Sequence, residues 1–351
     1  MITMQSTASR SKRRAIHWMG ALAILLGTQI QAHAAQEVSL YTTREPKLIL
    51  PLLESFTTKT GIKVNTVFVK SGLIERVKTE GEKSPADVLM AVDIGNLIDL
   101  VENGVTQPIT SAVLNSAIPP HLRSEDGQWF ALSLRDRVLY ADKGLQVKSF
   151  TYENLADPKW KGKVCIRSGQ HPYNNALIAS MIAHNGLEQT EKWLRGVKAN
   201  LARKPAGGDR DVARDILGGI CDIGLANAYY AGQMKTSAQG TDARKWGEAI
   251  TVVRPTFAKT GGTFVNISGA SVAKYAPNKE NAVKLLEFLV SDEAQGIYAK
   301  ANFEYPVKPG APKEATIESF GPLHVDPTPL KDVARYRKQA SELVDRVRFD
   351  Q

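Results

Sequence analysis

The strongest constraint on the fold is the alternation of strand-like and helix-like segments between residues 37 and 104. Short apolar segments predict strands, and each is followed by a segment with apolar residues at helical spacing. The order is strand 37–43, helix 46–61, strand 62–70, helix 72–84, strand 85–93 and helix 94–104. This alternation predicts an open, mostly parallel α/β sheet, in which ligands bind beyond the carboxyl ends of the strands.

A second α/β unit is predicted to begin near residue 135. Its expected strands are 135–143, 163–169 and 220–230, and its expected helices are 175–186, 190–202 and 209–219. Strands 250–257 and 262–274 return towards the first unit. Because strands rather than a Gly/Ser-rich linker join the two units, we expect a hinged, two-lobed protein that closes around a ligand.

The expected domain division has five parts. These are a signal peptide (1–34), the first segment of the N-lobe (35–135), the C-lobe (136–262), a return segment to the N-lobe (263–310) and C-terminal helices packing on the C-lobe (311–351).

The first 34 residues have the three regions of a secretory signal peptide. Arg10 and the basic run 12–14 precede a short apolar stretch, and Ala32 and Ala34 provide the small residues of a cleavage site. The apolar stretch is short for a membrane span. We therefore expect cleavage after Ala34 and export from the cytoplasm, with an uncleaved anchor as the alternative.

Charge and composition are those of an ordinary soluble protein. The 351 residues are 43% hydrophobic and 23% charged, and the formal net charge is +9. Loss of residues 1–34 removes four basic and no acidic residues, which leaves +5. Basic and acidic residues are interleaved, so we expect no nucleic-acid partner. A basic lining of a cleft that receives an anion fits the excess better.

Two cysteines, Cys165 and Cys221, each precede a segment that carries candidate site residues. Two thiols without further cysteine partners argue against a zinc or iron–sulfur site. An exported protein permits a disulfide between them. Two buried free thiols are the alternative, and we favour the disulfide.

Catalytic signatures are absent from the sequence. The histidines beyond residue 34 are His121, His171, His184 and His324, and none lies in a metalloprotease motif. The sequence also lacks a nucleophile elbow and a phosphate-binding loop. We therefore expect a binding protein rather than an enzyme.

Three tyrosines lie where strands of the second unit end. Tyr229 and Tyr230 follow the segment 220–228, and Tyr173 lies in the loop after 163–169. Loops at one edge of a sheet converge, so three phenols can meet there. A phenolate is a hard, anionic oxygen ligand that suits Fe(III) better than copper or zinc. The alternative places Tyr229 in the core, Tyr230 on the surface and Tyr173 beside a helix end.

The chain resembles the periplasmic ferric-iron-binding proteins of bacterial ABC importers over residues 35–351. The motifs that carry the resemblance are "LYTTRE", "SPADVLM", "LRDRVLY", "YENLADPKWKGKVCIRSGQHPYN", "GICDIGLANAYY", "NISGASVAK" and "NFEYPV". The motif "DPKWKGKV" also occurs in related receptors for other ligands, whereas "NAYY" together with "YN" is specific to the iron group. The resemblance implies the transferrin-like, two-lobed periplasmic binding protein fold.

The resemblance places the paired tyrosine ligands at Tyr229 and Tyr230 and a third at Tyr173. The N-lobe departs from the family, because Glu45 stands where a histidine ligand is usual and Val92 where other members have a glutamate. Glu45 is either a direct ligand or the partner of a neighbouring base. A small anion such as carbonate is expected to complete the metal shell.

Four residues are candidates for binding that anion: Arg44, Arg135, Arg137 and Ser168, the last in a loop that opens a helix. The resemblance thus predicts a monomeric periplasmic receptor that captures Fe(III) and delivers it to an inner-membrane ABC permease. The alternative is a receptor of the same fold that binds a small anion and no iron.

Overall fold

The expected alternation is present in the computed structural model, which describes residues 36–351. The predicted signal peptide and its cleavage site lie outside the described residues. The first elements are β1 (Glu37–Thr42), α1 (Pro46–Thr60), β2 (Lys63–Phe68), α2 (Leu73–Glu80), β3 (Val88–Val92), α3 (Ile94–Glu102), β4 (Thr106–Gln107) and α4 (Ala112–Ala117).

Helix α1 shows why these segments fold as the sequence predicts. Pro46 stands in its first turn, where the missing N–H is not needed. Ile49, Leu52 and Phe56 recur at helical spacing and are buried. The helix ends at Gly61, whose φ of 72° lies in the left-handed region that glycine adopts without strain.

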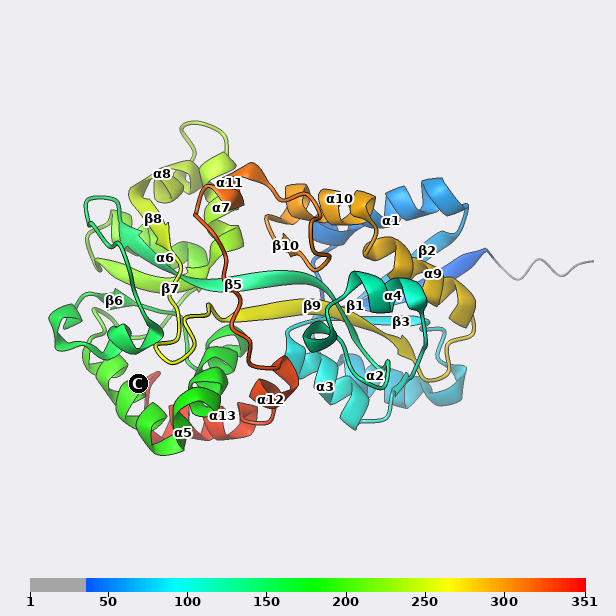
Figure 1. Ribbon diagram of the computed structural model, residues 1–351, viewed down its shortest axis with the longest axis horizontal. Coiled ribbons are helices and arrows are strands. Elements are labelled where there is room, and N and C mark those ends of the chain that lie inside the picture. Colours follow the sequence, from blue (N-terminus) through cyan, green and yellow to red (C-terminus); the bar gives the residue numbers. More distant parts are fainter. Residues whose placement is uncertain (1–35) are drawn as a thin grey trace, which may run out of the picture. The chain divides into compact units, whose positions relative to one another are not determined.

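The strands form one mixed sheet in the order β2-β1-β3-β9-β5-β7-β6. Strands β1, β2 and β3 are parallel to one another, as are β6 and β7. The central strands β5 (Phe130–Asp142) and β9 (Val265–Ala273) are antiparallel to their neighbours. They lie side by side through the middle of the view in Figure 1.

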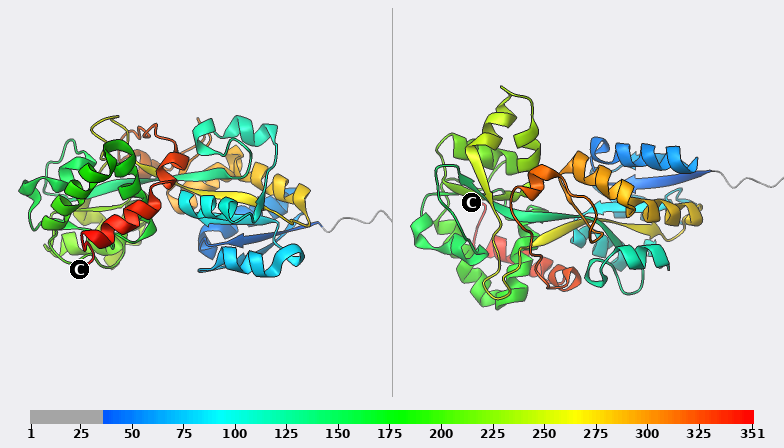
Figure 2. Two further views of the ribbon diagram at one scale, coloured as in Figure 1. Left: turned by 90° about the horizontal axis from the view of Figure 1, so that it is seen from below. Right: turned by 45° about the horizontal axis from the view of Figure 1, so that its top comes forward.

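Strand β5 belongs to both halves of the sheet. Its residues 130–136 pair with β9, and its residues 137–142 pair with β7 and β8. Figure 2 shows β5 continuing from one half to the other in both views. The boundary expected at 135/136 therefore falls inside a continuous strand. The fold is the predicted α/β class, with two halves joined by shared strands.

The C-terminal half of the sheet carries its own set of helices. Its elements are β6 (Val164–Cys165), α5 (Pro172–Ala199), α6 (Asp209–Leu217), β7 (Ile223–Asn227), α7 (Ala228–Thr236), α8 (Asp242–Ala249) and β8 (Ile250–Val253). The strand expected over 163–169 is only two residues long. The two helices expected on either side of Gly186 form one element, α5, which is interrupted at Gly186 by a φ of 77°.

The chain then returns to the N-terminal half and ends against the C-terminal half. The elements are α9 (Lys279–Leu289), α10 (Asp292–Asn302), β10 (Tyr305–Pro306), α11 (Ala315–Glu318), α12 (Leu330–Ala334) and α13 (Arg337–Arg346). Helices α12 and α13 pack against α5, and α12 also contacts α3. Within residues 36–351, no helix combines the length and the apolar character that a membrane crossing needs.

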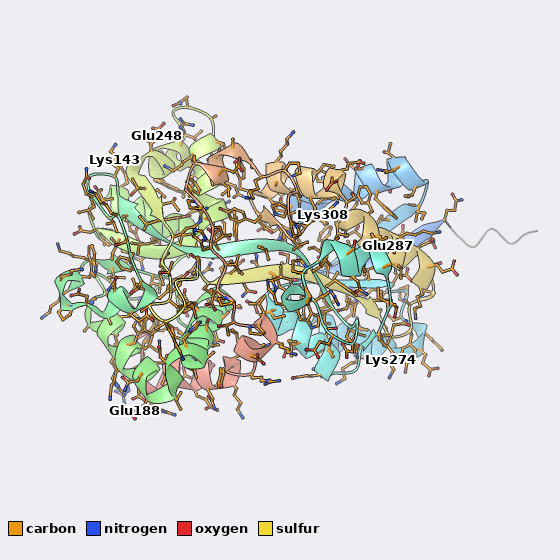
Figure 3. All side chains as sticks on the ribbon, viewed as in Figure 1. Lys143, Glu188, Glu248, Lys274, Glu287 and Lys308 are labelled. Carbon is orange, nitrogen blue, oxygen red and sulfur yellow. A yellow bond between two sulfur atoms is a disulfide. The ribbon has the colours of Figure 1, made fainter. Side chains whose placement is uncertain are left out.

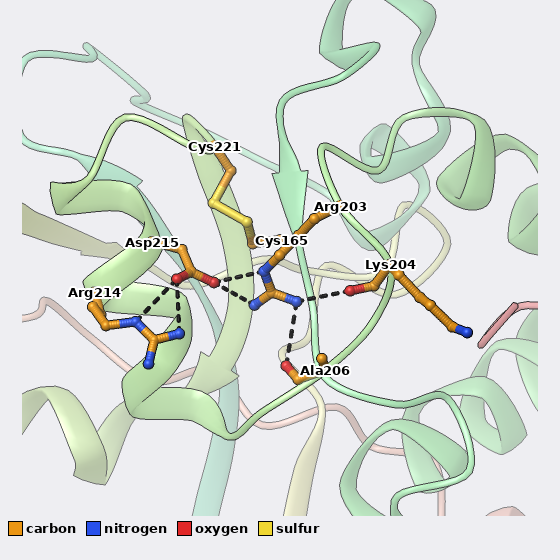
Figure 4. Close-up of a disulfide and its surroundings, with 7 residues drawn as sticks. All are labelled: Cys165, Arg203, Lys204, Ala206, Arg214, Asp215 and Cys221. Carbon is orange, nitrogen blue, oxygen red and sulfur yellow. Dashed lines mark hydrogen bonds and ion pairs between the residues drawn. A yellow bond between two sulfur atoms is a disulfide. The ribbon is translucent and has the colours of Figure 1, made fainter.

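A disulfide joins Cys165 to Cys221, as favoured from the sequence (Figure 4). Cys165 ends β6, and Cys221 lies two residues before β7 begins. The β6–β7 pairing covers only two residues on each strand. The disulfide therefore fixes a short strand whose backbone hydrogen bonds alone would hold it weakly.

Removal of this disulfide is expected to destabilise the protein. In the double variant Cys165→Ser/Cys221→Ser, the unfolded chain regains the freedom of a loop with a sequence separation of 56. The expected loss in unfolding free energy is about 2–4 kcal/mol. Equilibrium unfolding in urea, with the oxidised wild type as reference, measures it; equal midpoints would contradict the expectation.

Candidate functional site

A cavity of about 180 Å³ lies between residues of the two halves of the sheet. The N-terminal half contributes the loop after β1, Val92 at the end of β3, and Glu304. The C-terminal half contributes the first turns of α5, α6 and α7, and β5 contributes Arg135. The lining residues are Thr43, Arg44, Glu45, Lys47, Leu48, Val92, Arg135, Tyr173, Arg210, Tyr229, Tyr230, Gln233 and Glu304.

All three predicted tyrosines line this cavity. Strand β7 ends at Asn227 and α7 starts at once, so Tyr229 and Tyr230 occupy its first turn. Their ring centroids are 4.1 Å apart. Tyr173 lies in the first turn of α5, and its hydroxyl is 3.4 Å from the hydroxyl of Tyr229. Two separate strand-to-helix turns thus bring the phenols together.

The paired phenols are poorly solvated. Tyr229 is 7% exposed, and Tyr230 is partly buried. Burial raises the pKa of Tyr229 well above that of an ordinary phenol, and the nearby Tyr173 adds to the effect. The pKa of Tyr230 is raised for the same leading reason. Both groups are therefore neutral donors near pH 7 unless a cation replaces their protons.

Tyr173 lies between two guanidinium groups. Arg135 and Arg167 each place their central carbon 5.2 Å from the centroid of its ring. The imidazole of His171 lies edge-on to the same ring, with centroids 4.5 Å apart. Burial and the charge of Arg167 lower the pKa of His171 to about 4, so it is neutral near pH 7. The ring of Tyr173 therefore contacts two cationic groups and one neutral imidazole.

Arg135 has hydrogen-bonding capacity to spare. Its side chain is 3% exposed, and its Nη2 donates to the carbonyl oxygen of Ile267 at 2.7 Å. Its buried Nε has no partner among the described residues. Because a buried guanidinium normally satisfies most of its donors, Arg135 is equipped to bind an anion in the cavity.

The predicted anion-binding residues do not all reach the cavity. Arg44 and Arg135 line it, whereas Arg137 and Ser168 do not. Arg137 is 1% exposed and forms an ion pair with Asp209 at 2.6 Å. Ser168 donates to a carboxylate oxygen of Asp350 at 2.6 Å. Both side chains are occupied by the protein itself, so the structure does not support their predicted contact with an anion.

Glu45 lines the cavity from the N-terminal half. Its side chain is largely exposed, and the ammonium of Lys47 lies 3.7 Å away. Because it is exposed, the Glu45 carboxylate is free to turn towards the phenols or to stay with Lys47. Other charged residues, such as Lys143, Glu188 and Lys274, are labelled in Figure 3.

Sequence reasoning missed four residues that shape the site. Glu304 lies in the "NFEYPV" motif, where it was quoted but given no role. Arg210 and Gln233 line the cavity, and Arg210 lies 4.7 Å from the centroid of the Tyr230 ring. Arg167 stands next to the "SGQ" loop. Segment 208–215 has a helical charge pattern typical of a solvated face, which concealed Arg210.

The ligand types in the cavity are unusual for a common metal site. Among residues 36–351, no three His, Cys, Asp or Glu side chains are grouped so that they could hold a metal ion. The converging oxygens are phenolic, and phenolate is a hard donor suited to a hard, highly charged ion.

Comparisons with known proteins identify a matching family, relatives in sequence and similar solved structures. Residues 83–323 match the family described as bacterial extracellular solute-binding protein. Iron uptake protein A1 of Synechocystis is 42% identical over 314 residues, which are 88% of this chain and 86% of that protein. A solved structure titled Bordetella ferric binding protein is 72% identical with a TM-score of 0.87, covering 90% of this chain and 100% of that one.

A second solved structure is also similar to this chain. It is a Trichodesmium protein in complex with iron and citrate ligands, 43% identical with a TM-score of 0.84. The match covers 89% of this chain and 99% of that chain.

Loss of the Asp209 carboxylate is expected to destabilise the C-terminal half. Asp209→Asn removes the counter-ion of the fully buried Arg137, and an uncompensated buried charge costs about 3–5 kcal/mol. Asp242→Asn is the matched control, because its ion pair with Lys245 is exposed and contributes at most about 0.5 kcal/mol. Chemical unfolding compares the two; equal effects would contradict this reasoning.

Proposed function

The chain belongs to the bacterial extracellular solute-binding protein family, and we propose that it is a periplasmic receptor that binds Fe(III) through the phenolates of Tyr173, Tyr229 and Tyr230. The observation that carries the proposal is the convergence of these phenols on one cavity, with two of the hydroxyls 3.4 Å apart. The names of the Synechocystis and Bordetella relatives, which refer to iron, support it.

The chemistry of the donors favours trivalent iron. Three phenolates neutralise the charge of Fe(III), and a multivalent cation is strong enough to displace protons from groups whose pKa is raised by burial. Phenolate ligation of ferric iron also occurs in haem proteins. The surrounding arginines help, because their positive charge stabilises the phenolate oxygens once the metal has displaced the protons.

The remaining coordination positions are proposed to take a small anion, carbonate or a similar one, and a carboxylate. Arg135 is the proposed anchor of the anion, because it is buried, lines the cavity and has a free donor. Arg44 lies at the N-terminal side of the same cavity and is proposed to approach the anion there. Glu45 is the proposed carboxylate ligand from the N-terminal half.

The proposed capture of iron uses the strands that the two halves of the fold share. We propose that the halves 35–135 with 263–310, and 136–262 with 311–351, act as lobes that close on the metal through β5 and β9. The signal peptide proposed for residues 1–34 directs the chain to the periplasm. There it acts as a monomer and passes the iron to an inner-membrane ABC permease.

A second function is tested directly, because three arginines line the cavity. In that alternative the protein binds a small anion and no iron. Metal analysis of protein purified without chelators separates the two, since the iron receptor retains iron and shows a visible phenolate-to-iron absorption band. A colourless protein stabilised by anions alone would favour the alternative.

Removing the paired phenols is expected to abolish iron binding. In Tyr229→Phe/Tyr230→Phe, two of three proposed ligands are lost, so Fe(III) affinity falls at least about a hundredfold and the visible band disappears. Tyr275→Phe is the control, because Tyr275 is 42% exposed and does not line the cavity. An unchanged band and affinity in the double variant would refute the proposed ligands.

Iron affinity is expected to fall as pH drops. Burial raises the pKa values of Tyr229 and Tyr230, so both phenols are protonated near pH 7 in the empty cavity and must release protons to the solvent on binding. Each proton displaced from these two phenols lowers the affinity about tenfold per pH unit, so together they give up to about a hundredfold per pH unit. Competition titrations against citrate between pH 6 and 8 measure the slope. A flat profile would contradict phenolate ligation.

A further inference from the structure

A buried ion pair forms the N-terminal wall of the cavity. Arg44 Nη2 lies 2.5 Å from Oε1 of Glu304, and Arg44 Nη1 donates to Oε2 at 3.3 Å. Both residues are nearly inaccessible, at 3% and 4% exposure, and both line the cavity. This bidentate geometry is that of a buried ion pair in which the Glu304 carboxylate balances the charge of Arg44.

The two shared strands hold this ion pair in place. Ser133 on β5 donates to Glu304, and Ser268 on β9 accepts from Arg44 Nη1 at 2.7 Å. These two serines are register partners in the β5–β9 ladder. Because backbone pairing fixes both serines, Glu304 has little freedom to leave Arg44 and ligate a metal. Its effect on the cavity is electrostatic.

The buried charges around the tyrosines nearly balance. Asp209 is shared by Arg137 and Arg167, and Asp93 is close enough to Arg135 for that charge to act on its pKa. Three buried guanidinium groups thus face three buried carboxylates: Arg44, Arg135 and Arg137 against Asp93, Asp209 and Glu304. The partly buried Arg167, which shares Asp209, adds one positive charge, and the exposed Glu45, Lys47 and Arg210 also line the cavity. Of the three buried carboxylates, only Glu304 lines the cavity.

We propose that Glu304 sets the charge of the anion that binds beside the iron, a step that rests on the proposed function. Fe(III) and three phenolates are neutral together, so the anion must balance the side chains that remain. With Glu304 ionised, Arg44 is already neutralised and an anion of low charge suffices. Without it, Arg44 is an uncompensated buried cation and the cavity prefers an anion with one more negative charge.

The test compares anions of different charge in Glu304→Gln. Fe(III) is titrated in carbonate-free buffer with acetate, a monoanion, or malonate, a dianion, and the phenolate-to-iron band reports binding. Malonate preference is the half-saturating concentration of acetate divided by that of malonate. One added unit charge is expected to raise this preference at least about tenfold over the wild type.

Two further variants isolate the charge effect. Glu82→Gln makes the same change in net charge at an exposed residue that does not line the cavity, so its preference is expected to match the wild type. Arg44→Gln/Glu304→Gln removes both charges of the pair together with the proposed contact between Arg44 and the anion. Both anions are therefore expected to bind more weakly, while the ratio of their half-saturating concentrations returns to within about threefold of the wild type. This double variant leaves no unpaired charge and carries the test if Glu304→Gln alone does not fold.

The outcomes separate this proposal from the proposed function. If all variants show the visible band and the malonate preference of Glu304→Gln equals that of the wild type, the proposed role of Glu304 is overturned, but the proposed iron binding is not. A tenfold shift in the double variant, or an equal shift in Glu82→Gln, also overturns it. A wild type that shows no band with either anion overturns both proposals. Melting of iron-free protein with each anion gives an independent readout, and malonate is expected to stabilise Glu304→Gln more than the wild type.

Discussion

The ion pair between Arg137 and Asp209 organises the cavity without taking part in it. Arg137 also donates to the side chains of Asn174 and Asn227, which adjoin the two tyrosine-bearing turns. Asp209 in turn accepts from the backbone N–H of Asn227 and from Arg167, which packs on the tyrosine of α5. One buried pair therefore connects β5, the start of α5, α6 and the end of β7. The relative placement of the phenols depends on these bonds more than on any contact between the phenols themselves.

The buried charges near the cavity form two groups. One group holds elements of the fold together, and the other faces the cavity. The pair of Arg137 with Asp209 is fully enclosed by protein, whereas Arg44 with Glu304 and the less satisfied Arg135 face the cavity. Burying so many charges is costly unless each is hydrogen-bonded. The cost is offset here because the same bonds hold strands and helix starts together. Among the described residues, the buried Nε atoms of Arg44, Arg135, Arg137 and Arg167 have no hydrogen-bond partner. Of these four, only Arg44 and Arg135 line the cavity, where an anion is proposed to bind.

The sequence predicts the fold better than it predicts the surroundings of the charged residues. Hydrophobic periodicity and the glycine at position 61 are local signals, and they place β1, α1 and α3 to within two residues. The helix expected over 72–84 ends earlier, at Glu80, and the strand expected over 85–93 begins later, at Val88. Spacing alone left Tyr229 and Tyr230 open to a packing role, and the resemblance singled them out; the structure places both at one cavity, and their role as ligands stays a prediction. Arg137 and Glu304 differ, since the partner of each is distant along the chain and nothing local shows whether an arginine faces a cavity or a carboxylate.

Strand β5 has a consequence for how the molecule unfolds. Its first part completes the ladder of one half and its last part completes that of the other, without a break in the strand. Melting either half would strip hydrogen-bonding partners from the same thirteen-residue segment, Phe130–Asp142. The energetic coupling between halves is therefore built into the backbone. A protein built in this way cannot lose the structure of one half without exposing part of the backbone of the other, which raises the free energy of the partly unfolded states that proteases could attack.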